Sequence, residues 1–66
     1  MKYENVKIMW FNTLKNYGEG IDALGNVIFV IGEAFPNPLK LVADKRIKAV
    51  LKKDQGRVYT FQGKLR

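Results

Sequence analysis

The stretch Lys7-Ile8-Met9-Trp10-Phe11-Asn12-Thr13-Leu14-Lys15-Asn16-Tyr17-Gly18 decides the fold that we expect for this chain. Residues 2–11 read as a β-strand with Val6 and Ile8 on one face, and residues 12–16 are polar and turn-rich. Neighbouring residues of a strand face opposite sides of a sheet, so at most one of Trp10 and Phe11 points inward. The stretch therefore predicts a strand and a turn that leave an aromatic ring on the surface.

Four further segments have the composition of short strands, separated by glycine or proline. They cover residues 17–23, 27–32, 45–53 and 57–65. Leu24-Gly25-Asn26 predicts a tight hairpin turn, and Asp54-Gln55-Gly56 predicts a three-residue hairpin loop. The segment 33–44 contains Pro36-Asn37-Pro38, so we expect a long loop with one helical turn near residues 39–43. The pattern indicates one all-β domain over residues 1–66.

One segment also fits a helix. Residues 39–51 contain no glycine or proline, and the apolar positions 39, 42, 43, 47, 50 and 51 follow helical spacing. An α+β fold is therefore the alternative to the all-β fold.

The composition excludes several classes of site. The chain of 66 residues is 47% hydrophobic, as in a globular domain, but contains neither cysteine nor histidine. Zinc sites and Ser-His or Cys-His nucleophile pairs need these side chains. The aspartates lie near predicted turns and no close acidic pair is evident, so we expect no enzymatic activity, no metal and no cofactor. The longest apolar run, 27–32, is far too short to span a membrane, and a cytoplasmic location is expected.

The charge is the first indication of a partner. Twelve Lys and Arg residues against six Asp and Glu residues give a net charge of +6. A small domain this basic is attracted to polyanions such as nucleic acids. A charge of this size also serves solubility alone, so it does not decide the function.

Aromatic side chains accompany the basic residues on neighbouring strands. Trp10, Tyr17 and Phe29 lie among small and basic residues, which is typical of a platform on which nucleic-acid bases stack. The competing interpretation is that these rings fill a small core.

Residues 7–18 resemble the Lys-Val-Lys-Trp-Phe-Asn-x-x-Lys-Gly-Tyr/Phe-Gly motif of the bacterial cold-shock domain, and Ile28-Phe29-Val30 is similar to the core of its second motif, Val-Phe-Val-His-Phe. The order and separation of the two motifs agree, over about the first half of the chain. The resemblance implies a five-stranded antiparallel OB-fold barrel that binds single-stranded DNA or RNA with low sequence specificity. It also implies nucleic-acid contacts at Lys7, Trp10, Lys15, Tyr17 and Phe29, with Phe11 flanking the platform.

The sequence departs from the family motif at several positions. Met9 stands where a second lysine is usual, and Asn16 replaces a glycine. Glu19 stands where the family has a phenylalanine, and Ile31-Gly32 replaces His-Phe. Three platform side chains are therefore missing, and one of them is replaced by a negative charge. This distance from the family suggests a viral or mobile-element origin.

Two interpretations follow from these departures. In one, the binding path has moved toward further aromatic residues, Tyr3, Phe35, Tyr59 and Phe61, and a distal basic cluster, Lys45, Arg46, Lys48, Lys52, Lys53 and Arg57. From that cluster we predict contacts at Lys48, Lys52, Lys53 and Arg57. In the other, the barrel is a protein-interaction module, an inhibitor or regulator. A homodimer through an exposed edge strand is a further expectation.

Overall fold

Five strands account for most of the chain in the computed structural model, which describes residues 2–65. They are β1 (Glu4–Asn12), β2 (Tyr17–Asp22), β3 (Val27–Ile31), β4 (Arg46–Asp54) and β5 (Arg57–Leu65). Each overlaps one of the five segments that the sequence predicts. Their boundaries differ from the predicted ones by no more than two residues.

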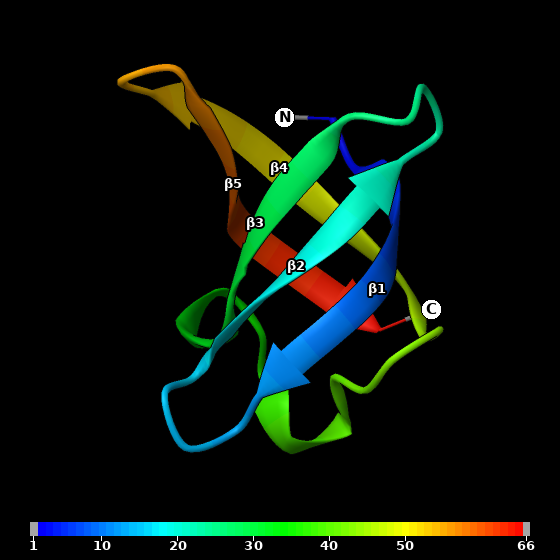
Figure 1. Cartoon of the computed structure of the whole chain (residues 1–66), viewed down its shortest axis with the longest axis vertical. Helices are drawn as coiled ribbons and strands as arrows, with labels where there is room; N and C mark the ends of the chain where they lie inside the picture. The colour runs from blue at the N-terminus through cyan, green and yellow to red at the C-terminus, as the bar shows by residue number, and fades with distance from the viewer. Residues whose placement is uncertain (1, 66) are drawn as a thin grey trace.

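The strands form a closed barrel in the order β1-β2-β3-β5-β4, because β4 also pairs with β1. In Figure 1, β1, β2 and β3 cross in front of β4 and β5. Four of the interfaces between strands are antiparallel, but β3 and β5 are parallel. The all-β barrel is thus confirmed and is consistent with an OB-like fold, whereas the expectation of a purely antiparallel sheet is wrong.

The barrel leaves no unpaired strand within residues 2–65, since each strand has a neighbour on both sides. Closure of this kind removes the row of free N–H and C=O groups that an edge strand presents. β3 and β5, however, pair at only one register position, and the expectation of a homodimer through an edge strand stays a prediction.

The segment that fits a helix in sequence forms a loop and a strand. Two short 3₁₀ turns lie at Gly32–Ala34 and Pro38–Lys40, and the predicted helical turn is thus one residue earlier than expected. From Arg46 onward the chain is strand β4, hydrogen-bonded to β1 on one side and β5 on the other. Pairing on both sides satisfies the backbone groups of β4 and outweighs its helical spacing. No helix in residues 2–65 is long and apolar enough to cross a membrane.

The core fills the barrel with aliphatic side chains from β1, β3 and β4, including Ile8, Ile28 and Ile47. Phe35 and Leu41 come from the β3–β4 loop, which lies across the lower end of the barrel in Figure 1. A side chain at Gly63 would overlap the Phe35 ring, so this glycine makes room for the aromatic plug. Phe35 is buried and is not available as an additional surface aromatic.

The β4–β5 hairpin is tighter than the sequence predicts. Asp54 and Arg57 are paired, so the loop contains two residues and not three. Gln55 and Gly56 both have positive φ, 51° and 80°. This combination is typical of a type I′ turn, whose twist matches that of the flanking strands. The turn places Arg57 at the start of β5, opposite the end of β4.

The parallel contact between β3 and β5 closes the barrel through a side chain. The register pairs Phe29 with Tyr59 alone. Two residues further along β3, the Ile31 N–H donates a 2.9 Å hydrogen bond to Thr60 Oγ1, and this hydroxyl lies 3.5 Å from the Ile31 carbonyl oxygen. Among residues 2–65, Thr60 is the one buried polar side chain. The Thr60 hydroxyl therefore takes the place of backbone–backbone hydrogen bonds between β3 and β5, which pair at only one register position.

The Thr60 contact gives a stability prediction. Thr60→Val keeps the shape of the side chain but leaves the Ile31 N–H without its acceptor, which costs about 1–3 kcal/mol of unfolding free energy. Thr60→Ser keeps the hydroxyl and is expected to lose less. Urea unfolding followed by circular dichroism measures both, with Thr13→Val in the exposed β1–β2 turn as the control. Equal stability of Thr60→Val and wild type would show that the hydroxyl does not close the barrel.

Candidate nucleic-acid interface

Four residues lie in one row across four neighbouring strands of the barrel. The register pairs Trp10 of β1 with Glu19 of β2, Glu19 with Phe29 of β3, and Phe29 with Tyr59 of β5. Residues paired across strands lie on the same face of a sheet. The row therefore presents three aromatic side chains and one carboxylate side by side; we call it the aromatic row.

A bulge in β1 brings Trp10 to the surface. The register shifts between Ile8 and Trp10, so Met9 is an extra residue opposite β2. Met9 and Trp10 are both exposed, by 41% and 39%, while Phe11 packs against the core. The prediction that at most one of Trp10 and Phe11 faces inward is confirmed. Phe11 lies on the opposite face from the aromatic row.

Tyr17 connects the aromatic rings into a group. Its ring centroid lies 5.6 Å from that of Trp10, with an edge-to-face geometry. It lies 5.5 Å from that of Phe29, with the planes tilted by 38°. These separations are within the range of favourable aromatic pairs. Trp10, Tyr17 and Phe29, which the sequence singles out, therefore come together on one surface.

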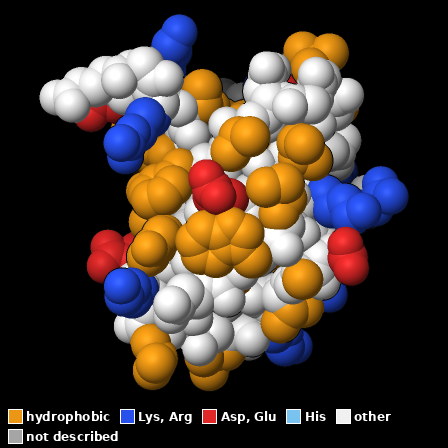
Figure 2. Space-filling view, viewed as in Figure 1, with side chains coloured by type: hydrophobic (Ala, Val, Ile, Leu, Met, Phe, Trp, Pro, Cys, Tyr) orange, Lys and Arg blue, Asp and Glu red, His pale blue; other side chains and the backbone are white. Residues whose placement is uncertain are grey.

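Glu19 lies in the middle of this surface. The Trp10 indole Nε1–H donates a 3.0 Å hydrogen bond to Glu19 Oε1. Figure 2 shows an acidic side chain surrounded by hydrophobic side chains at the centre of the face viewed. The bond satisfies the indole and fixes the carboxylate between the Trp10 and Phe29 positions. The departure of Glu19 from the family motif therefore falls inside the aromatic row.

The other departures have structural explanations. Asn16 has a φ of 61°, in the left-handed region where glycine is favoured and asparagine is tolerated. Gly32 is buried against the Asn16 side chain, which occupies the space that a Cβ would need. Ile31 is paired with Tyr17 and is half-buried. Gly32 therefore does not mark a gap in the aromatic surface, because its position faces the turn.

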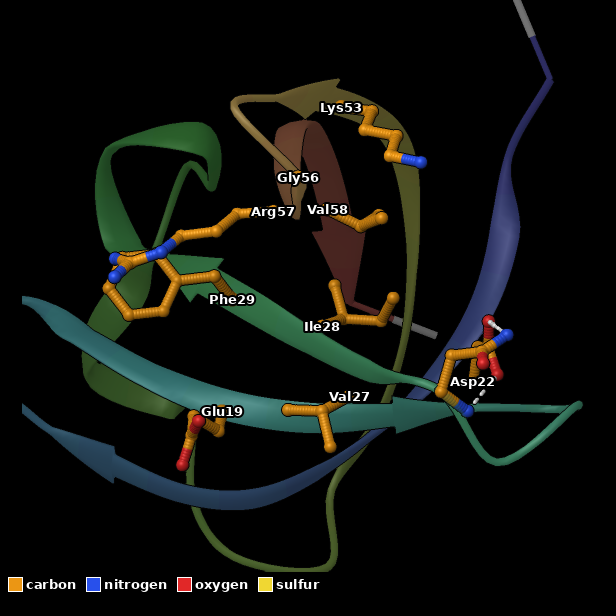
Figure 3. Close-up of a pocket in the computed structure, with 10 residues that line it drawn as sticks. Glu19, Asp22, Val27, Ile28, Phe29, Lys53, Gly56, Arg57 and Val58 are labelled. Atoms are coloured by element: carbon orange, nitrogen blue, oxygen red, sulfur yellow. Dashed lines mark hydrogen bonds between the residues drawn. The ribbon is translucent and has the colours of Figure 1, made fainter.

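A groove runs between the aromatic row and the β4–β5 hairpin. Its volume is about 620 Å³. Ile28 and Val58 are among its lining residues, as are Glu19, Phe29, Lys53 and Arg57. In Figure 3 the Arg57 side chain extends from β5 toward the Phe29 ring. An adjoining groove of about 560 Å³ is lined by Phe29, Arg57 and Tyr59. Of the predicted cations, Arg57 thus lies beside the aromatic row, whereas Lys53, which is paired with Val58, lines the groove further from Phe29 (Figure 3).

The remaining predicted cations are distributed around the barrel. Lys7 lies in β1, three residues before Trp10, and forms a 3.6 Å ion pair with Asp44, with both side chains exposed. Lys15 is exposed in the β1–β2 turn, where Asn12 Oδ1 accepts hydrogen bonds from the Leu14 and Lys15 N–H groups.

The two other predicted cations, Lys52 and Lys48, both lie on β4. Lys52 is paired with Tyr59, the last residue of the aromatic row, and therefore extends the row, whereas Lys48 lies outside it. Lys52 Nζ lies 3.6 Å from the centre of the Phe61 ring. Lys48 is paired with Asn5 of β1 and Lys64 of β5. Lys64 in turn lies over the Tyr3 ring. Phe61 and Tyr3 are therefore occupied by lysines, and the structure does not bring Lys48 together with Trp10, Tyr17 and Phe29.

Sequence reasoning assigned no contact to Tyr59, although it named this residue among further aromatic side chains. Its position depends on the parallel pairing of β3 with β5, between residues thirty positions apart in sequence. No local pattern in the sequence indicates which residues of two such distant strands are paired. Among residues 2–65, no group of three or more metal-binding side chains is found.

The comparisons with known proteins do not name a family. No family model matches the chain, and no curated protein matches its sequence. The resemblance to the cold-shock domain thus rests on the motif residues and on the barrel that they form.

A pH prediction concerns the turn at the end of the groove. The pKa of Asp22 is lowered from its ordinary value of 3.8, first because its carboxylate accepts a hydrogen bond from the Asn26 backbone N–H, and also because it accepts hydrogen bonds from the Asn26 side-chain amide and the Leu24 N–H. Because the Asp22 carboxyl has a lower pKa in the folded protein than in the unfolded chain, its ionised form stabilises the fold above pH 3.8. This stabilisation is lost as the pH falls through the pKa of Asp22 in the folded protein.

We therefore expect the carboxyl chemical shift of Asp22 to titrate below pH 3.8 in NMR spectra. Asp22→Asn removes this titration, and its unfolding free energy is expected to depend less on pH in the acid range than that of wild type. Identical acid dependence of the two proteins would contradict this role of the turn.

Proposed function

We propose that this barrel binds single-stranded DNA or RNA, with bases stacked on the aromatic row and phosphates near the cations beside it. The observation that carries the proposal is the surface formed by Trp10, Tyr17, Phe29 and Tyr59 across four strands. Each base stacked on an aromatic side chain contributes about 1–3 kcal/mol. Since every base has an aromatic face, such a surface favours single strands with low sequence specificity.

The positive charges around the aromatic row suit a nucleic-acid strand that crosses it. Lys15 lies in the turn beside β1 and β2, while Lys53 and Arg57 line the groove on the β5 side. A backbone that passes over Trp10 and Phe29 therefore meets cations at both ends of its path. The net charge of +6 adds a long-range attraction for the strand.

A protein-interaction module is the second candidate, because Glu19 and exposed apolar side chains such as Met9 and Val27 lie on the same strands as the aromatic rings. A titration of Trp10 fluorescence with oligo-dT and oligo-U separates the two candidates. Salt-sensitive quenching supports nucleic-acid binding. An unchanged spectrum at micromolar strand concentration would favour the protein partner.

Phe29 and Phe61 provide a matched pair of variants. Phe29→Ala removes a ring from the aromatic row and is expected to weaken strand binding about fivefold to a hundredfold, the effect of one stacked base. Phe61→Ala removes a 43% exposed ring that lies under Lys52, outside the row, and is expected to have little effect. Anisotropy of a labelled oligo-dT measures both affinities.

Phe29→Leu keeps an apolar side chain at this half-buried position, and circular dichroism verifies the fold of each variant. If Phe61→Ala weakened binding as much as Phe29→Ala did, the binding surface would not be the aromatic row.

Salt dependence tests the phosphate contacts. Each phosphate neutralised on a single strand contributes about −0.7 to the slope of log K against log salt concentration. Lys53→Gln and Arg57→Gln, at the groove, are each expected to reduce the steepness by about this amount. Lys64→Gln, whose lysine lies over Tyr3, is the control and is expected to leave the slope unchanged. Equal changes for all three variants would indicate non-specific attraction without a defined path.

A further inference from the structure

The carboxylate of Glu19 is a hydrogen-bonding group within an otherwise aromatic surface. Its strand position is directly paired with Phe29, and the residue lines the groove together with Phe29. Residues paired across strands have Cβ atoms about 5 Å apart. A base stacked on Phe29 therefore has one edge within reach of the Glu19 carboxylate.

The Trp10 side chain orients this carboxylate. The indole N–H occupies one acceptor position of Oε1. An ionised carboxylate offers about four such positions on its two oxygens, so acceptor capacity remains for a ligand. Glu19 is also half-buried, which strengthens a hydrogen bond relative to one made in water.

The chemistry of the base edges separates the possible ligands. Guanine presents two parallel N–H donors, from N1 and the 2-amino group, which match the two oxygens of one carboxylate. Adenine and cytosine each present an amino group next to a ring-nitrogen acceptor. Thymine and uracil present one N–H between two carbonyl oxygens, and these oxygens repel a carboxylate.

The side of the groove opposite Glu19 carries positive charge. Lys53 and Arg57 line it, and Arg57 extends toward Phe29 (Figure 3). A nucleotide whose base edge meets Glu19 can therefore place its phosphate beside Arg57. The groove volume of about 620 Å³ gives room for one nucleotide.

We propose that the groove is a guanine-selective subsite, in which a guanine stacks on Phe29 and its N1–H and 2-amino groups donate to the Glu19 carboxylate. The inference rests on the proposed function and makes it more specific. Glu19 binds the base, and Trp10 acts as a positioning residue for its carboxylate.

The test compares oligothymidines that carry one central guanine, inosine, adenine or no substitution, with affinities measured by anisotropy of a labelled strand. Guanine is expected to bind about tenfold more tightly than thymine, within the discrimination of a good bidentate pair. Inosine lacks the 2-amino group and is expected to lose most of this preference. Equal affinities for guanine and inosine would overturn the bidentate contact.

Three variants locate the preference. Glu19→Gln is expected to abolish the guanine preference and to raise the affinity for oligothymidine, because a negative charge is removed. Glu33→Gln is the matched control, since it removes the charge of an exposed glutamate in the β3–β4 loop and is expected to keep the preference. Trp10→Phe keeps an aromatic ring without the donor and is expected to reduce the preference.

The outcomes separate this inference from the proposed function. If the wild-type protein binds all the strands equally and Glu19→Gln strengthens binding uniformly, Glu19 only repels phosphate and the guanine subsite is wrong, while strand binding stands. If no strand binds, both proposals fail. Competition by free GMP shows whether the site binds a strand or a mononucleotide. If GMP displaces the labelled strand at the same concentration as an unlabelled strand does, the groove is a mononucleotide site and the strand proposal is wrong.

Discussion

The contact between Thr60 and Ile31 is the constraint on which the arrangement of the surface depends. It joins β3 to β5, the two strands that are far apart in sequence and pair in parallel at only one register position. Without this junction the pairing of β1 with β4 would still hold the strands in one sheet, in the order β3-β2-β1-β4-β5, but the sheet would be open. The junction aligns Tyr59 with Phe29 and brings Arg57 to the groove. The same buried hydroxyl thus closes the core and assembles the candidate binding surface.

The outer surface follows from how β1 and β2 fit together. Met9 is the extra residue of a bulge, and such bulges re-aim neighbouring side chains. Gly18 and Gly20 lie on the buried side of β2, where an added Cβ would meet the backbone of β1. Close approach of these two strands leaves Trp10 and Tyr17 near enough to pack edge to face on the outer side. Small residues inside the barrel therefore help to set the spacing of the large residues outside it.

Local features of the sequence were enough to predict the five strands, the loop before β4 and the grouping of Trp10, Tyr17 and Phe29. Alternation, glycine and proline positions and the adjacent Trp10-Phe11 pair act over a few residues, so they can be read without a structure. The parallel β3–β5 pairing could not be read in this way, since closure is a property of the whole chain. The same limit explains why Lys48 was grouped with Lys53 and Arg57. These residues are close in sequence, but the barrel places Lys48 between β1 and β5, outside the aromatic row.

The sign of the charge changes from the edge of the candidate surface to its centre. Cations lie at its margins, while Glu19 lies between Trp10 and Phe29. Net positive charge acts over about 10 Å at moderate ionic strength and attracts any polyanion. At contact distance, however, a carboxylate such as that of Glu19 repels a phosphate and is an acceptor for the N–H groups of a base. In the proposed complex the two effects therefore act at different steps: the margin draws the strand to the surface, and the centre turns the bases inward and the backbone outward.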